Sequence, residues 1–363
     1  MNLLIFILIL VALIVVHELG HFSVAKLFGI RVDEFGVGFP PRLWGKKIGE
    51  TLYSVNLLFF GGFVRIFGEN EQEAGQNPRS FANKSRWIQS AVIAAGIICN
   101  ILFAWVVLSA GYMAGLPTST EHVGIGEVSN AKTTVVGVYP ASPAAKAGIE
   151  AGDTIQSIAT GAGVEYTPES SQYTQEFIHT HQDESLVIKT IPLHGGEEET
   201  FVVKAVEGLI EGKKVLGVQL EDVGVLQLPP HLALVQGGIL TWNMTESTAV
   251  GLYQFFSQIF LGKADFSSVA GPIGIARVGA QAVSSGFAAA VSLTALISIN
   301  LALINILPIP GLDGGRLFII ALEAISRRKL SDKWLTYASF TGFGLLILLM
   351  LVVSYHDIIR LLS

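Results

Sequence analysis

The segment VVHELGHFSVAK, residues 15–26, places two histidines and a glutamate directly after an almost wholly apolar stretch, MNLLIFILILVALIVV. In a membrane span, a charged side chain near the centre costs about 2.5 to 3.5 kcal/mol on insertion scales. Three ionisable residues within five positions, His17, Glu18 and His21, therefore indicate a functional site within a helix that the apolar residues predict to be membrane-embedded.

The composition is that of a membrane protein with a soluble insert. Of the 363 residues, 51% are hydrophobic and 14% are charged, whereas soluble domains carry about 25% charged residues. Four segments are long and apolar enough to cross about 30 Å of hydrocarbon. They run approximately from Leu3 to Ala25, Ile88 to Leu116, Ala288 to Leu307 and Leu335 to Val353.

The charges predict how these spans are oriented. No lysine or arginine precedes Lys26, so the first span lacks the positive end of a signal peptide and is interpreted as retained. Basic residues gather between spans one and two and between spans three and four, which we expect to face the cytoplasm. The acidic insert between spans two and three, and both termini, then lie outside. A net charge of -6 argues against a nucleic-acid partner.

The insert, from about Glu121 to Gly224, has a soluble composition. Its segment TTVVGVYPASPAAKAGIEAGDTIQSI predicts a strand, a short alanine-rich helix and a Gly-Asp turn into a second strand. From Val138 to Ile155 it resembles a PDZ domain of the bacterial periplasmic type, which implies binding of extended peptide ends by strand addition. The alternative is a module that serves only as a spacer.

Two further segments are candidates for membrane association. Leu52 to Glu69 has strand-like residues around Gly61-Gly62, which predicts a β-hairpin. Because it is too apolar for water, we expect it to dip into the membrane against protein; an ordinary soluble hairpin is the alternative. Residues 241–262 suit an amphipathic helix at the interface, or a buried packing helix.

The histidine pair has the pattern of a zinc hydrolase. His17 and His21 are four residues apart and share one face of a helix. In H-E-x-x-H motifs the two imidazoles bind zinc, and the glutamate, here Glu18, takes a proton from a water molecule beside the metal. The single cysteine, Cys99, excludes an intrachain disulfide or a cysteine-based metal cluster.

Such a site needs a third protein ligand. Asp33 and Glu34 are the nearest acidic residues, but Asp313 is the better candidate, because Pro308 and Pro310 end the third span just before it, on the side of the membrane predicted for His21. The alternative role for Asp313 is that of a helix cap.

Taken together, these motifs resemble the site-2 protease family of intramembrane metalloproteases, in the branch of the bacterial regulator of sigma-E protease. The resemblance covers almost the whole chain: HELGH, a Gly-x-x-x-Asn from Gly96 to Asn100, the PDZ module, AGPIGIA at 270–276, and N-x-x-P-x-P-x-L-D-G at 305–314. The chain departs from the family pattern in having room for one PDZ domain instead of two. Its second span also reads AAGIICN, without the proline that often follows the glycine.

The resemblance implies a zinc-dependent endopeptidase of the bacterial inner membrane, with His17, His21 and Asp313 as zinc ligands and Glu18 as the general base. It also implies that Asn300 and Asn305 hold an extended substrate strand, although asparagines also join membrane helices. The implied substrates are single-span membrane proteins, such as anti-sigma factors and signal-peptide remnants. The resemblance also implies that a first protease trims their outer domain and that the trimmed end then meets the PDZ module.

The expected fold is a polytopic α-helical membrane protein with a membrane-associated β-hairpin and an inserted extracytoplasmic PDZ domain. The predicted parts are residues 1–118 and 281–363 for the membrane core, 119–226 for the PDZ domain and 227–280 for an amphipathic linker. Two rival functions stay open. A metal transporter would need a polar path that spans two and four scarcely offer, and a non-catalytic helix-binding pseudoprotease would not need Glu18.

Overall fold

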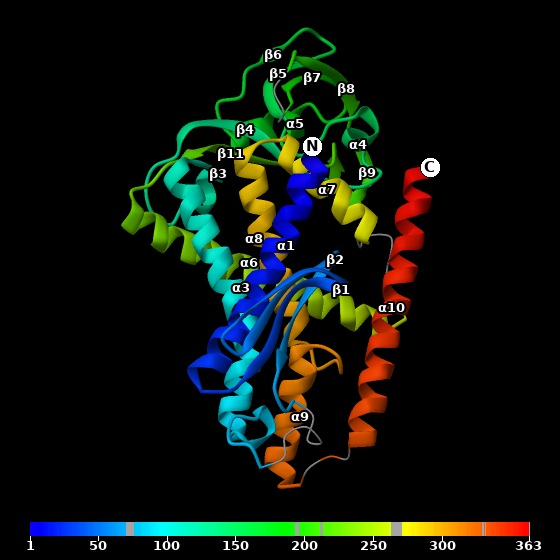
Figure 1. Ribbon diagram of the computed structural model, residues 1–363. Helices are drawn as coiled ribbons and strands as arrows, with labels where there is room; N and C mark the ends of the chain where they lie inside the picture. The colour runs from blue at the N-terminus through cyan, green and yellow to red at the C-terminus, as the bar shows by residue number, and fades with distance from the viewer. Residues whose placement is uncertain are drawn as a thin grey trace. The chain divides into compact units, whose positions relative to one another are not determined.

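The computed structural model describes residues 1–69, 76–192, 196–210, 213–262, 271–328, 330 and 332–362. Contacts divide the chain into two compact units, both visible in Figure 1. Unit 1 comprises Met1–Leu108, Gly238–Val283 and Ala289–Ser363, and unit 2 comprises Ser109–Gly237 and Ser284–Ala288. Ala270 and Lys329, which belong to the AGPIGIA motif and to the basic link before the fourth span, lie outside the described residues.

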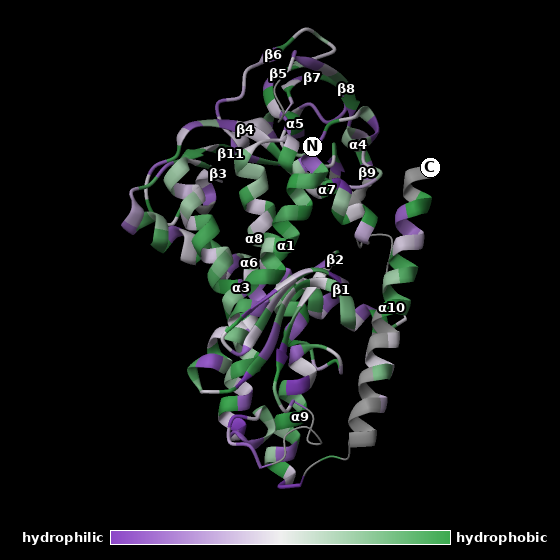
Figure 2. Cartoon of the chain, viewed as in Figure 1, coloured by the Kyte–Doolittle hydropathy of each residue, from purple (hydrophilic) through white to green (hydrophobic). Residues whose placement is uncertain are grey.

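Four helices coincide with the predicted apolar segments. They are α1 (Asn2–Leu27), α3 (Arg86–Ala114), α8 (Phe287–Ile306) and α10 (Asp332–Leu362). Each contains a stretch long and apolar enough to cross a membrane, which in α10 is Phe340–Ile359. Figure 2 shows hydrophobic residues along nearly all of α1. Leu4 and Leu8 of α1 are 61% and 60% exposed, and apolar area of this extent is suited to contact with lipid.

The predicted hairpin is part of a larger sheet. Strand β1 (Val32–Ile48) and strand β2 (Thr51–Ile66) are joined at Gly49–Glu50, where Gly49 has φ +62°. Gly61-Gly62 is therefore not a turn, and the predicted position of the hairpin turn is wrong: Gly62 lies within β2 and pairs with Val37. The sequence signal was misleading because two adjacent glycines also suit a strand that another chain segment approaches closely.

The two strands curl so that β1 is paired on both of its sides. Residues 34–37 pair with residues 52–55 and also with residues 62–65, while residues 44–48 pair with residues 51–55. Segment 62–66 is thus an edge of the sheet. The sheet packs on α1, where the Phe22 ring lies 5.5 Å from Phe35 and 6.0 Å from Tyr53 between centroids.

The described residues of unit 1 also form most of α6 (Pro230–Phe260), α7 (Pro272–Ser284) and α9 (Asp313–Ser326), together with a short 3-10 turn, η1 (Phe81–Asn83). The predicted amphipathic segment is the second half of α6, where Trp242 and Tyr253 are exposed. Asp357 of α10 is buried and accepts hydrogen bonds from the backbone N–H groups of Gly271 (3.1 Å) and Gly274 (2.8 Å) at the start of α7.

Unit 2 is built on an antiparallel sheet whose strands follow the order β3-β11-β4-β5-β7-β8, with β6 paired to β5. The elements are β3 (Leu116–Ser119), η2 (Thr120–His122), β4 (Ser129–Val138), α4 (Pro143–Ala147), β5 (Thr154–Thr160), β6 (Glu165–Tyr166), α5 (Ser171–Thr180), β7 (Ser185–Ile191), β8 (Glu199–Lys204), β9 (Val206–Ile210), β10 (Lys213–Val215) and β11 (Val218–Leu226). Strands β9 and β10 form a separate pair.

The core of unit 2 follows from the alternation of its strands. The alternate side chains Leu186 and Ile188 of β7 are buried. In β5 a register shift between Ile155 and Ser157 interrupts the alternation, and Ile155 and Ile158 are both buried. The predicted short helix is α4, which Ser142 caps by accepting from the N–H of Ala145 at 3.1 Å.

Candidate metal centre

His17 and His21 lie one turn apart on α1 and point toward α3. Both side chains are buried, and most of the other residues of α1 are apolar. Helix α3 approaches closely because Gly96 has no side chain: a Cβ there would lie 2.5 Å from Nε2 of His21 and 2.8 Å from Cε1 of His17. The glycine therefore leaves the space that both imidazole rings occupy.

Asp313 joins the two histidines from the other end of the sequence. Its Oδ2 lies 3.0 Å from Nε2 of His17 and 3.3 Å from Nε2 of His21, and the two Nε2 atoms are 3.2 Å apart. The ligand atoms of these three residues all lie within 4.8 Å of one another, and the group could hold a metal ion. The geometry brings together the three residues predicted as zinc ligands.

The loop after α8 puts Asp313 in this place. Helix α8 ends at Ile306, and Pro308 and Pro310 cannot continue it because proline lacks the backbone N–H. Asp313 is then the first residue of α9, where no side-chain capping hydrogen bond forms. Oδ2 of Asp313 is buried and has no hydrogen-bond partner within the described part of the chain. These observations do not support the alternative role of Asp313 as a helix cap.

The donor atoms fit zinc. Nδ1 of His21 lies 2.9 Å from the carbonyl oxygen of Val92, which can only accept, so this nitrogen carries a proton. In a neutral ring, Nε2 of His21 is then a lone pair that faces a carboxylate oxygen and a second imidazole nitrogen. Such atoms repel one another unless a proton or a metal cation lies between them. Tetrahedral zinc, with bonds of about 2.0 to 2.2 Å, holds neighbouring donors about 3.3 Å apart, close to the spacing observed here.

Glu18 follows His17 on α1 and is partly buried. No hydrogen bond or ion pair of its carboxylate is found among the described residues, so the group is available to a water molecule or a substrate. Strand β2 passes beside it: a Cβ on Gly62 would lie 3.1 Å from Cγ of Glu18. The edge of the sheet therefore runs past the residue predicted as the general base.

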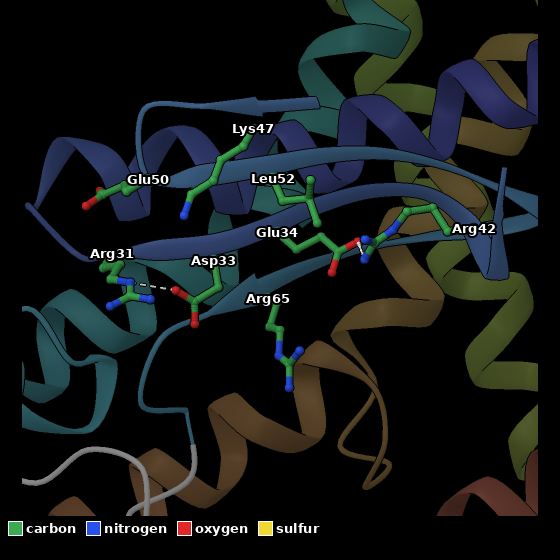
Figure 3. A pocket seen from close by; sticks show the side chains of 8 residues that line it. All are labelled: Arg31, Asp33, Glu34, Arg42, Lys47, Glu50, Leu52 and Arg65. Atoms are coloured by element: carbon green, nitrogen blue, oxygen red, sulfur yellow. Dashed lines mark hydrogen bonds and ion pairs between the residues drawn. The ribbon is translucent and has the colours of Figure 1, made fainter. Parts of the chain in front are cut away.

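The other acidic candidates lie elsewhere. Asp33 accepts a hydrogen bond from Arg31 at 2.6 Å, and the buried Glu34 accepts from Arg42 at 2.9 Å and from Ser54 at 2.7 Å. Both line an open pocket of about 340 Å³ on the β1–β2 sheet, together with Arg31, Arg42, Lys47, Glu50, Leu52 and Arg65. Figure 3 shows the Arg31–Asp33 and Arg42–Glu34 pairs in this sheet pocket. Neither residue belongs to the group formed by the histidines and Asp313.

The two asparagines predicted to hold substrate lie on α8, but not on one face of it. Asn305 follows Asn300 by five positions, which turns their side chains about 140° apart on a helix. The amide nitrogen of Asn300 donates to the carbonyl of Leu296, in the preceding turn, at 3.0 Å. Both side chains are partly buried.

Sequence reasoning gave no role to the stripe of α3 that supports the histidines. Val92, Gly96 and Asn100 are spaced four residues apart and thus share one face of the helix. The carbonyl of Val92 contacts His21, Gly96 leaves space for both rings, and the side-chain nitrogen of Asn100 lies 3.3 Å from Nδ1 of His17. The four-residue spacing, which matches that of the histidines, is the signal that could have revealed the stripe.

Comparison with known proteins shows the family of the chain. The model of peptidase family M50 matches residues 5–349. A protein of Clostridium acetobutylicum, named as a candidate zinc metalloprotease, is 33% identical over 367 residues, covering 99% of this chain and 97% of the relative. Zinc metalloprotease RasP of Geobacillus kaustophilus is 28% identical over 441 residues, covering 97% and 96%. The chain therefore belongs to peptidase family M50, the site-2 protease family, and is a zinc-dependent metalloprotease of the membrane.

Proposed function

We propose that this metalloprotease cleaves within or beside the transmembrane segment of single-span membrane proteins. In this proposal His17, His21 and Asp313 hold zinc and Glu18 is the general base. The observation that carries it is the convergence of two imidazole nitrogens and a buried carboxylate oxygen, 3.0 to 3.3 Å apart, beside a helix apolar enough to span a membrane. Ionisable groups inside a membrane span cost free energy, so their presence there indicates a function.

The roles of the side chains follow from their positions. When bound, zinc would acidify a water molecule and polarise the scissile carbonyl. Glu18, whose carboxylate is free of partners in the described part of the chain, would take the proton of the attacking water and pass it to the leaving amine. His17 and His21 are fixed by contacts with α3, so they would hold their positions while the substrate changes shape.

A substrate helix has to unwind before it can be cleaved, because its carbonyls are hydrogen-bonded within the helix. We propose that the edge of the sheet at residues 62–66 pairs with the extended substrate, since this edge lies beside Glu18. Asn300 and Asn305 would bind backbone groups that unwinding releases. Their angular separation on α8 means that each would hold a different part of the substrate, so their effects can be measured separately.

We propose that unit 2 is a PDZ domain that binds peptide ends or trimmed outer domains. Strand β11 is paired with β4 along residues 218–225, whereas β3 covers only residues 223–226 on the other side. Residues 218–222 thus form an edge to which a peptide could add as a strand. Helix α5 lies beside this edge, where Gln175 donates to the carbonyl of Leu220 at 3.3 Å. The competing role is that of a spacer or a size filter.

The proposed setting is a bacterial inner membrane that the chain crosses four times. The basic segments would face the cytoplasm, and the PDZ domain and both termini would lie outside. The substrates would be anti-sigma factors or signal-peptide remnants that a first protease has already trimmed. The sheet would dip into the membrane from the cytoplasmic side, covered there by α1.

The test is Glu18→Gln, because this change removes the base but leaves the three proposed ligands in place. We expect membrane fractions of cells carrying the variant to accumulate truncated single-span fragments that the unaltered protein removes. Cleavage of such a fragment should slow by at least about 100-fold, the usual contribution of a general base. The matched control is Glu165→Gln in unit 2, an exposed glutamate, which should leave cleavage unchanged.

Two outcomes would contradict the proposal. Equal cleavage by Glu18→Gln, at equal expression and zinc content, would remove Glu18 from the reaction. Zinc uptake into sealed vesicles that depends on the histidines would favour a transporter instead.

A further inference from the structure

The contacts of the two histidines with α3 are unequal. The proton on Nδ1 of His21 has an acceptor that cannot donate, the carbonyl oxygen of Val92. Nδ1 of His17 instead faces an amide side chain, that of Asn100, whose nitrogen lies 3.3 Å away. This difference leaves open which group accepts the corresponding proton of His17.

His17 needs such an acceptor if it binds zinc through Nε2, the atom that faces Asp313. A neutral imidazole has one proton, so a free Nε2 requires the proton on Nδ1. That N–H is buried and therefore needs an acceptor. The nitrogen of the Asn100 amide cannot serve, because it is itself a donor.

The other end of the same amide is unsatisfied. Asn100 is fully buried, and its Oδ1 has no hydrogen-bond partner within the described part of the chain. A half-turn of the amide exchanges the oxygen and the nitrogen without moving the rest of the side chain. Oδ1 would then lie where Nδ2 lies now and accept the Nδ1 proton of His17. One rotation thus supplies a partner for the unsatisfied oxygen and for the histidine proton.

The backbone around Asn100 is also held in place. The hydroxyl of Ser298, a fully buried residue of α8, donates to the carbonyl oxygen of Asn100 at 2.8 Å. Asn100 of α3 is therefore held by α8 as well as by its contact with His17 of α1. Such support is what a residue needs if it is to fix the orientation of a metal ligand.

We propose that Asn100 is a positioning residue: its amide oxygen accepts the Nδ1 proton of His17 and so keeps Nε2 free for zinc. This inference rests on the proposed role of His17 as a ligand. It adds that His17 requires the amide oxygen of Asn100, which accepts a hydrogen bond, and not the amide nitrogen, which donates one.

The experiment measures zinc affinity of the full chain in detergent, by competition with a chromophoric chelator. Asn100→Leu, which has similar volume and no acceptor, should weaken zinc binding by about 10- to 100-fold, as loss of a group that orients a ligand does. Asn100→Asp offers only oxygens at the same position and should bind zinc within a few-fold of the unaltered protein. Asn243→Leu, the same change at an exposed position of α6, should leave zinc affinity unchanged.

The results separate this inference from the proposed function. If Asn100→Asp binds zinc as weakly as Asn100→Leu, while both unfold thermally like the unaltered protein, the acceptor role is wrong. Unchanged affinity in Asn100→Leu would also overturn it. If Asn100→Leu does not fold, retention of affinity in Asn100→Asp supports the inference and its loss contradicts it. His17→Ala tests the site itself: if that variant binds zinc normally, the proposed function fails.

Discussion

The proposed metal centre and the sheet pocket of unit 1 both contain charged groups, but they differ in whether their carboxylates accept hydrogen bonds. In the pocket, Asp33, Glu34 and Glu50 each accept a hydrogen bond from an arginine. At the metal centre, Oδ2 of Asp313 is buried opposite two imidazole nitrogens and accepts no hydrogen bond from the described residues. A cluster whose groups satisfy one another supports the fold, whereas one with unsatisfied, converging acceptors is suited to a ligand.

The largest expected difference between the two clusters is in zinc binding. Asp313→Asn should weaken zinc binding by more than about 100-fold, since loss of a ligand exceeds the 10- to 100-fold cost of losing an outer partner. Asp33→Asn, the same change in the sheet pocket, should not alter it. Metal analysis of the purified variants gives the answer. Equal zinc content in all three proteins would mean that Asp313 is not a ligand.

The next largest effect concerns the edge of the sheet that approaches the metal centre. Gly62→Ala adds a methyl group 3.1 Å from Cγ of Glu18 and 3.0 Å from Cγ2 of Ile14, closer than ordinary contact. We expect cleavage to slow by about tenfold or more, because a small displacement of a catalytic group is costly. Zinc content should stay unchanged. Gly251→Ala in α6, where nothing lies within 4 Å, is the control and should cleave normally.

A smaller effect is expected at the centre of the sheet pocket. Glu34→Gln removes a buried charge that accepts from Arg42 and Ser54, so the free energy of unfolding should fall by about 1–3 kcal/mol. Thermal unfolding in detergent measures this change. Zinc content should not respond, and a variant that lost zinc would assign Glu34 to the metal centre after all.

The smallest effect is a dependence on pH at Glu50. Hydrogen bonds from Arg79 and Lys26 lower the pKa of Glu50 to about 2. Because the folded pKa lies below the unfolded value, this carboxylate stabilises the fold above about pH 4.5 and loses the effect as pH falls toward 2. Glu50 is partly exposed, so the contribution should not exceed about 1 kcal/mol.

The measurement compares the unaltered protein with Glu50→Gln by thermal unfolding at pH 6 and at pH 3. The difference between the two proteins should shrink at the lower pH. A difference that grows on acidification would contradict the assigned sign. Glu165→Gln, an exposed glutamate of unit 2, should show no such trend.

The two clusters also differ in how far the sequence revealed them. The HELGH motif, and an aspartate after two prolines at the end of an apolar segment, were enough to predict that His17, His21 and Asp313 meet. The sheet was misjudged because its pairing is non-local: residues 34–37 pair with two separate segments, and no local pattern specifies which ones. Strand β1 was missed altogether, since its glycines, prolines and charged residues weaken the alternation typical of strands.

The support given by α3 could not be predicted for a related reason. Asn100 was visible in a Gly-x-x-x-Asn pattern, but its partner His17 depends on how closely two helices cross. That distance is set by Gly20, whose Cβ would lie 2.4 Å from the carbonyl oxygen of Ala95, and by Gly96. A single sequence shows the small residues but not which helix packs closely against them.

The position of Asp313 at the first residue of α9 has a consequence for unfolding. The histidines and Asp313 come from opposite ends of the chain, so an ion shared by them would act as a cross-link that closes a very long loop. Removing the ion would restore the entropy of that loop to the unfolded chain. It would also remove one link between α9 and α1, whose residues Ile320 and Ala25 belong to one hydrophobic cluster. A chelator would then do to this protein what a reducing agent does to one held by a long-range disulfide.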